Sequence, residues 1–107
     1  MSLDVYLKAN RLVNVHEGNI THNLNKMAKE AGLYEYLWRP EEVGITRSSQ
    51  LIRPLKKGLN ELKRHPEKYA KFNPDNGWGD YDGLVKFVEG YLNACINNKD
   101  ATIEVSR

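Results

Sequence analysis

The stretch LVKFVEGYLNACINNKDATIEV, residues 84–105, sets the expected fold class, because the spacing of its apolar residues changes part-way along. Between residues 84 and 95 the apolar side chains recur every three or four positions, which is typical of one buried helix face. These side chains are Leu84, Val85, Phe87, Val88, Tyr91, Leu92 and Cys95. After turn-forming residues at 97–100, apolar and polar residues alternate from Thr102 to Val105, which predicts a strand.

The strands that pair with residues 102–105 are expected at the other end of the chain. Leu3, Val5 and Leu7 alternate with polar residues, and residues 12–16 repeat the alternation more weakly after a turn at 8–10. These two segments predict a β-hairpin, which joins the terminal strand in a three-stranded sheet.

A first helix is predicted from about His22 to Ala31. Its apolar residues follow steps of three and four, Thr21 is a suitable N-cap, and Gly32 occupies the position of a left-handed stop. The aromatic segment 33–44 that follows predicts a short helical turn packed on the core.

A second helix is predicted to start near Thr46 or Ser48 and to end before Pro66. Because Pro54 lies inside it, we expect either a kink there or a true start near Arg53. The apolar stripe of this helix consists of Leu51, Ile52, Leu55, Leu59 and Leu62.

Gly58 lies on the apolar side of this second helix, where a missing side chain allows another element to approach closely. The elements follow the order β-β-α-α-α-β. This order predicts an α+β fold with a small three-stranded sheet and about three helices packed on one of its faces. The whole chain, residues 1–107, is expected to form a single domain.

The composition excludes several classes of protein. With 40% hydrophobic and 28% charged residues, the sequence is not that of a disordered, collagen-like or membrane-spanning chain. A net charge of +2 indicates no partner by itself. The single cysteine, Cys95, cannot form a disulfide within the chain and is expected in the core, and the first residues lack the cationic leader of a signal peptide. We therefore expect a reducing cytoplasm as its compartment.

Polar side chains are expected on the uncovered face of the sheet, because successive strand residues point to opposite faces. These side chains are Asp4, Tyr6, Asn14, His16, Thr102 and Glu104. Three interpretations stay open for this face: a solvated surface, an interface between copies of the chain, or a metal or catalytic site.

A ligand site is predicted where polar and aromatic residues gather in loops around helix ends. In this hypothesis two tryptophans supply stacking surface, an arginine pairs with negative charge, and the helix start near residue 21 offers N–H donors. The predicted site residues are Asn19, Thr21, His22, Asn23, Trp38, Arg39, Asn76, Trp78 and Tyr81. The alternative for Trp78 is a plug in the core beneath a tight turn.

Positive charge is concentrated between residues 47 and 71, where eight cations stand against two acids. Such a run is usually the solvated side of a helix, and the alternative is a face that binds phosphate or nucleic acid. The residues that would carry this face are Arg53, Lys56, Lys57, Lys63 and Arg64.

Catalytic motifs have little support in the sequence. His16 and His22 match no zinc spacing, and there is no nucleophile elbow or phosphate-binding glycine loop. We expect no cofactor and no bound metal and lean against an enzyme. A metal-dependent or hydrolytic enzyme built on His16 and His22 is the weakest alternative.

Five segments together resemble a known family. They are Asn-Ile-Thr-His-Asn-Leu at 19–24, Met-Ala-Lys-Glu-Ala-Gly-Leu-Tyr at 27–34, Leu-Trp-Arg-Pro-Glu-Glu at 37–42, Asn-Gly-Trp-Gly at 76–79 and Ile-Glu-Val-Ser-Arg at 103–107. At this spacing they are similar to a family of small uncharacterised proteins of bacteriophages, prophages and bacterial genomes. The resemblance implies a mobile-element setting in the cytoplasm of a bacterial host cell, and it implies no activity or cofactor.

The sequence as a whole predicts a non-catalytic binding protein for an anionic or nucleotide-like small molecule. The main alternative is a protein–protein interaction or oligomerisation module that uses the polar sheet face or the basic second helix. A homo-oligomer would favour this alternative, nucleic acid is a less favoured partner, and no membrane is expected.

Overall fold

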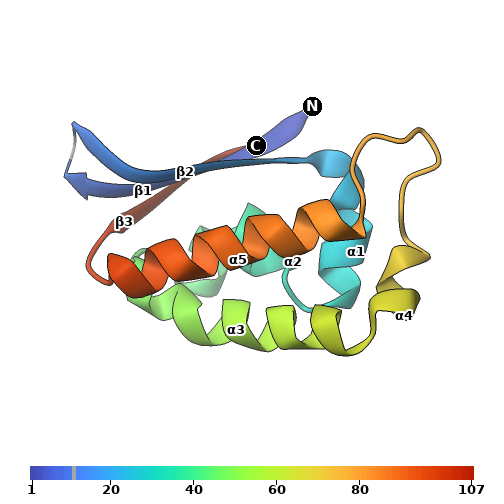
Figure 1. Cartoon of the computed structure of the whole chain (residues 1–107). Helices are drawn as coiled ribbons and strands as arrows, with labels where there is room; N and C mark the ends of the chain where they lie inside the picture. The colour runs from blue at the N-terminus through green and yellow to red at the C-terminus, as the bar shows by residue number, and fades with distance from the viewer. Residues whose placement is uncertain (11) are drawn as a thin grey trace.

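The computed structural model describes residues 1–10 and 12–107, which form a sheet with helices on one side of it (Figure 1). The strands are β1 (Ser2–Asn10), β2 (Val13–Thr21) and β3 (Thr102–Ser106). β1 lies in the middle and pairs antiparallel with both neighbours, in the order β2-β1-β3. This arrangement confirms the α+β class and the predicted pairing of the two ends of the chain.

The helical segments follow one another between β2 and β3, and they lie beneath the sheet in Figure 1. They are η1 (His22–Leu24), α1 (Asn25–Glu30), α2 (Tyr34–Trp38), η2 (Pro40–Val43), α3 (Ser48–Arg64), α4 (Pro66–Ala70) and α5 (Tyr81–Asn97). The three predicted helices correspond to η1 with α1, to α3 and to α5. The predicted helical turn over 33–44 is α2 with η2, whereas α4 was not predicted. Among the described residues, no helix has the length and apolar content needed to cross a bilayer.

The long helix α3 begins at Ser48, which confirms the predicted start near Thr46 or Ser48, and the alternative start near Arg53 is wrong. The first turn is held by side chains: the Gln50 side-chain oxygen accepts the backbone N–H groups of Thr46 and Arg47, at 2.9 and 3.0 Å. The buried Ser48 hydroxyl also donates to the carbonyl of Asn98 at the end of α5. These bonds stabilise the turn that precedes Pro54, so the helix continues through the proline.

The core lies between the inner face of the sheet and the pair of helices α3 and α5. Leu3, Val5 and Leu7 of β1 are fully buried, as the alternation predicts. Cys95 on α5 is also fully buried, and burial raises the pKa of its thiol to about 12. The prediction that Cys95 is a core residue is therefore confirmed.

At Gly58, helix α3 lies close to Leu33, the residue before α2. A Cβ atom at this position would lie 2.2 Å from Cδ2 and 2.3 Å from Cγ of Leu33, which is itself fully buried. No side chain fits at that distance without displacing Leu33. The prediction that Gly58 permits close packing is confirmed.

β2 departs from the predicted alternation. The sequence pattern places Val13 and Val15 against the helices, but these side chains are 47% and 38% exposed. Leu7 pairs with His16 and Lys8 pairs with Asn14, so Val15 of β2 has no partner on β1 and forms a bulge. A bulge of this kind exchanges the faces of the residues that follow it. His16 therefore takes the inward position, and the prediction that it lies on the uncovered face is wrong.

His16 lies against Tyr91 of α5, with ring centroids 5.7 Å apart and an angle of 11° between the planes. Tyr91 is fully buried, and its hydroxyl has no hydrogen-bond partner among the described residues. Burial raises the pKa of this hydroxyl well above its ordinary value.

A variant that removes the Tyr91 hydroxyl is expected to be more stable than the parent. Leaving a buried hydroxyl without a partner costs roughly 1–3 kcal/mol, and Phe keeps the ring that stacks on His16. We expect Tyr91→Phe to raise the free energy of unfolding by about 1 kcal/mol, as measured by urea unfolding. A loss of stability would instead mean that the hydroxyl has a partner, such as a buried water molecule.

Candidate functional site

A hollow of about 480 Å³ lies where the start of β1, the end of β2 and the loop before α5 meet. Its lining residues are Met1, Ser2, Asn19, Thr21, Asn23 and Trp78. Four of them, Asn19, Thr21, Asn23 and Trp78, belong to the ligand site that the sequence predicts. The fold thus brings together Asn23 and Trp78, which are 55 positions apart in the chain.

Trp78 lies in the loop between α4 and α5, and two asparagine side chains bond to its backbone. The side-chain oxygen of Asn76 accepts the Trp78 backbone N–H at 2.9 Å, and the Asn23 side-chain amide donates to the Trp78 carbonyl at 3.4 Å. Gly79 has a φ of 96°, and a Cβ there would lie 2.6 Å from Cγ2 of Thr21. The loop therefore packs directly on the start of η1 and leaves Trp78 71% exposed beside the hollow. The alternative that Trp78 plugs the core is wrong.

The polar side chains of the hollow present both acceptor oxygens and the hydroxyl groups of Ser2 and Thr21. The Asn19 amide donates to Asp4 at 2.6 Å and to Ser2 at 3.0 Å, and no described hydrogen bond takes its carbonyl oxygen. The Asn23 amide donates one hydrogen bond to Trp78, and no described hydrogen bond takes the Asn23 side-chain oxygen. None of the lining side chains is cationic. The free amide oxygens can accept hydrogen bonds from the hydroxyl groups of a ligand.

Two of the N–H donors predicted at the helix start, those of His22 and Asn23, are already used. The Thr21 side-chain oxygen accepts the Asn23 backbone N–H at 3.3 Å, which confirms Thr21 as a cap. The His22 backbone N–H donates to the carbonyl of Met1 at 3.3 Å. An anion at this helix start would have to displace these bonds, so this part of the predicted site loses support.

Trp38, the second predicted stacking surface, lies in the core. It is the last residue of α2 and is only 2% exposed. Its ring stacks on Tyr34 with centroids 5.5 Å apart, and it meets the ring of His22 at 6.1 Å in a T-shaped arrangement. Neither Trp38 nor His22 lines the hollow. The prediction that both tryptophans serve one pocket is therefore wrong.

Arg39 and Tyr81 make structural contacts outside the hollow. Arg39 donates to the Tyr34 hydroxyl at 3.2 Å and pairs with Glu42 at 2.9 Å, and these two partners raise the pKa of its guanidinium. The Tyr81 hydroxyl donates to the Leu62 carbonyl at 2.5 Å and so ties the start of α5 to the end of α3. The geometry gives these two residues no contact with a ligand in the hollow.

The two histidines of the predicted enzyme alternative do not share a site. His22 follows His16 by six positions along β2 and its end, which corresponds to about 20 Å in an extended chain. Burial lowers the pKa of His16, and the charge of Glu17 partly opposes this shift. In the described part of the chain, no three His, Cys, Asp or Glu side chains lie together in a way that could hold a metal ion.

The uncovered face of the sheet carries the remaining polar residues of the strands. Tyr6 occupies the middle of this face between Glu17 and Glu104, its partners on β2 and β3. The Lys8 ammonium pairs with Glu104 at 3.0 Å. With Asp4, the described residues of this face hold three carboxylates against one ammonium, so this part of the face is acidic. Asn14 on β2 and Thr102 on β3 are the partners of Lys8, at the end of this face that is farthest from Asp4.

The basic residues of α3 do not form a continuous cationic surface. Arg53, Lys56, Lys57, Lys63 and Arg64 are all exposed. However, Lys63 pairs with Glu89 at 2.6 Å, and Lys57 lines a shallow depression together with Glu30 and Glu61. Because carboxylates are interleaved with the cations, the structure favours a solvated helix face over a phosphate-binding one.

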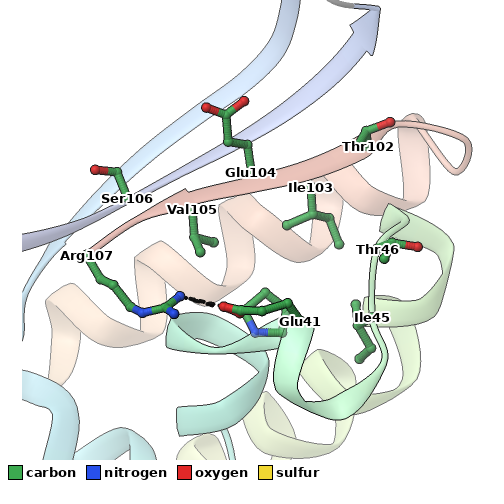
Figure 2. Close-up of a pocket in the computed structure, with 10 residues that line it drawn as sticks. Glu41, Ile45, Thr46, Thr102, Ile103, Glu104, Val105, Ser106 and Arg107 are labelled. Carbon is green, nitrogen blue, oxygen red and sulfur yellow. Dashed lines mark hydrogen bonds and ion pairs between the residues drawn. The ribbon is translucent and has the colours of Figure 1, made fainter.

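A second concave region, which the sequence did not indicate, runs along the free edge of β3 (Figure 2). This groove has a volume of about 680 Å³ and lies between β3 and the segment from η2 to Thr46. Its end is closed by Arg107, which pairs with Glu41 at 2.5 Å and donates to the Trp38 carbonyl at 3.0 Å. The apolar residues of its wall are Pro40, Ile45, Ile103 and Val105. Ile45 is an isolated apolar residue in a connection, so no periodicity could have signalled the groove.

Comparisons of the chain with protein-family models, with curated proteins and with solved structures found no match. The inferences below rest on the hollow beside Trp78 and on the groove along β3.

Proposed function

We propose that the chain is a non-catalytic binding protein that takes a nucleoside-like ligand in the hollow beside Trp78. The observation that carries this proposal is the 71% exposure of the Trp78 indole, on a residue whose backbone is held by hydrogen bonds to the side chains of Asn23 and Asn76. An exposed, positioned aromatic ring is a stacking platform for a flat ligand. The free carbonyl oxygens of Asn19 and Asn23 can accept hydrogen bonds from ribose hydroxyl groups.

The ligand in this proposal is an uncharged nucleoside. It keeps the nucleotide-like part of the class expected from the sequence and drops the anionic part. No cationic side chain lines the hollow, and Arg39 is engaged by Tyr34 and Glu42. A phosphate group would therefore find no charged partner among these side chains. A setting in phage or prophage biology and in the bacterial cytoplasm remains part of the proposal, supported by the resemblance of the five sequence segments.

Titration of the ¹⁵N-labelled protein with adenosine tests the proposal by NMR. We expect the indole N–H signal of Trp78 and the side-chain amide signal of Asn23 to shift, while the indole signal of buried Trp38 stays in place. Trp78→Ala is expected to weaken binding by about five- to 150-fold, because stacking of a base on an aromatic ring contributes about 1–3 kcal/mol.

Val43→Ala is the matched control, because Val43 is another exposed apolar residue and lies outside the hollow. It is expected to leave the adenosine affinity unchanged. Equal affinity in the parent and in Trp78→Ala, or shifts confined to residues away from the hollow, would contradict the proposed function.

A further inference from the structure

Part of the backbone at the outer edge of β3 is left without partners. The Ile103 N–H donates to the Thr46 carbonyl at 3.0 Å, so it points away from β1. Backbone groups of residues two apart in a strand point the same way, and the N–H and carbonyl of Val105 therefore face the open edge as well. None of the described hydrogen bonds outside the sheet takes these two groups of Val105. The bridge between Arg47 and Thr102 covers only the beginning of the strand.

The groove between β3 and the segment around Ile45 lies directly beside this open part of the strand (Figure 2). An extended chain rises about 3.3 Å per residue, so the stretch 104–106 offers pairing for about three residues. One wall of the groove is the edge of β3, and the other is the segment around Ile45. The space thus has the length and the backbone partners that an added strand requires.

We propose that this groove docks an extended segment of another protein, which pairs with β3 as a fourth strand of the sheet. In the docked segment a basic residue alternates with an apolar residue. This site is separate from the ligand hollow and does not depend on the function proposed for it.

The charge of the uncovered sheet face is the reason for the basic residue in the docked segment. A residue paired directly with Glu104 lies on the same face as Glu104, whose side chain is 57% exposed. Among the described residues, that face carries the carboxylates of Asp4, Glu17 and Glu104 against the ammonium of Lys8. Opposite charges directly across two strands stabilise the pair, so Lys or Arg is favoured there.

The apolar residue follows from the wall beneath the sheet. A residue paired with Val105 points to the helix side, as Val105 does. There it meets Pro40 and Ile45, which are themselves buried and contribute apolar surface to the groove. Burial of one such side chain adds affinity that does not depend on salt.

A second copy of this chain fits the groove less well. The edge strands that a second copy could offer are β2, with the sequence VNVHEGNIT, and β3, with the sequence TIEVS. Both carry a glutamate and neither contains Lys or Arg. Pairing of either strand with β3 would add carboxylates to a face that is already acidic. A partner protein that supplies the basic residue is therefore the favoured occupant.

The test uses the full chain and a synthetic peptide, acetyl-Lys-Val-Lys-Val-Lys-amide, as the probe. We expect the backbone amide signals of Ile45, Ile103 and Val105 to shift when the peptide is added to the ¹⁵N-labelled protein. The acidic counterpart, acetyl-Glu-Val-Glu-Val-Glu-amide, is expected to bind at least tenfold more weakly. Absence of peptide binding, or shifts along β2 instead of β3, overturns the proposal.

Two matched charge reversals locate the contact. Glu104→Lys is expected to weaken binding of the basic peptide about tenfold and to strengthen binding of the acidic one. Glu17→Lys changes the charge of the same face by the same amount at the far edge of the sheet, and we expect less than a twofold effect. Equal losses in the two variants would mean that the peptide binds the acidic face in general, which overturns strand addition.

Val105→Pro tests the backbone pairing itself. Because the Val105 N–H faces the open edge, proline removes a donor for the peptide without removing a bond to β1. We expect loss of peptide binding in a variant whose remaining amide spectrum is retained. Unchanged affinity in folded Val105→Pro overturns the proposal, as does a concentration-dependent dimer of the parent whose interface shifts coincide with β3.

Discussion

Replacing Trp38 by Ala is expected to lower the free energy of unfolding by about 3–5 kcal/mol, the usual range for truncating a buried tryptophan. The side chain is 2% exposed, stacks on Tyr34 and touches His22 edge-on. Removing it leaves a cavity between α2 and the start of η1. For a domain of this size, whose total stability is of the order of 5–15 kcal/mol, this is a large fraction. Urea unfolding followed by circular dichroism measures the loss.

The control for Trp38→Ala is the same substitution at the other tryptophan. Trp78 is largely exposed, so Trp78→Ala is expected to change the free energy of unfolding by no more than about 0.5 kcal/mol. Trp38→Phe gives a second comparison, because it fills most of the cavity and removes an indole N–H that has no partner among the described residues. A smaller loss for Trp38→Ala than for Trp78→Ala would show that the assignment of the two tryptophans is reversed.

Gly58→Ala is expected to destabilise the protein by about 2 kcal/mol, although alanine favours a helix over glycine by up to about 1 kcal/mol. The added Cβ would lie 2.2 Å from Cδ2 of Leu33, and Leu33 is enclosed on all sides. Forcing an extra carbon into a packed core costs about 1–3 kcal/mol, and a contact this short belongs at the upper end. Thermal or urea unfolding of the variant measures the effect.

Gly90→Ala is the matched control, since Gly90 lies inside α5 and a Cβ there would meet no atom within 4 Å. The helix preference then acts alone, and we expect a gain of about 0.5–1 kcal/mol in the free energy of unfolding. The two variants introduce the same methyl group and should therefore shift stability in opposite directions. Equal and favourable shifts would mean that α3 and Leu33 are not in close contact.

Only part of the candidate site could be predicted from the sequence. Asn19, Thr21, Asn23 and Trp78 were predicted together and do line one hollow, because a cap residue, turn formers and an isolated tryptophan are local signals. Trp38 was assigned to the same site and proved to be a core residue. The residues around Trp38 mix aromatic, charged and apolar side chains without regular spacing, so the sequence does not show which way the Trp38 side chain points.

The groove along β3 had no signal in the sequence, for a different reason. It exists because the connection around Ile45 returns to the edge of a strand almost sixty residues further along the chain. Nothing within a short window of the sequence specifies such a meeting. The same holds for α4, a single turn that depends on burial of Tyr69 and on its hydrogen bond to Glu61 at 2.8 Å.

The sequence by itself determined the α+β class, the three strands, the long helices and most of the core, because these depend on apolar periodicity and on residues that begin or end helices. Tertiary structure decided the register of β2. The bulge at Val15, which turns His16 inward to Tyr91, comes from the fit between two strands and a helix, and local propensity does not specify that fit. It also decided which tryptophan is exposed and where the free edge of the sheet lies, since both depend on contacts between segments far apart in the chain.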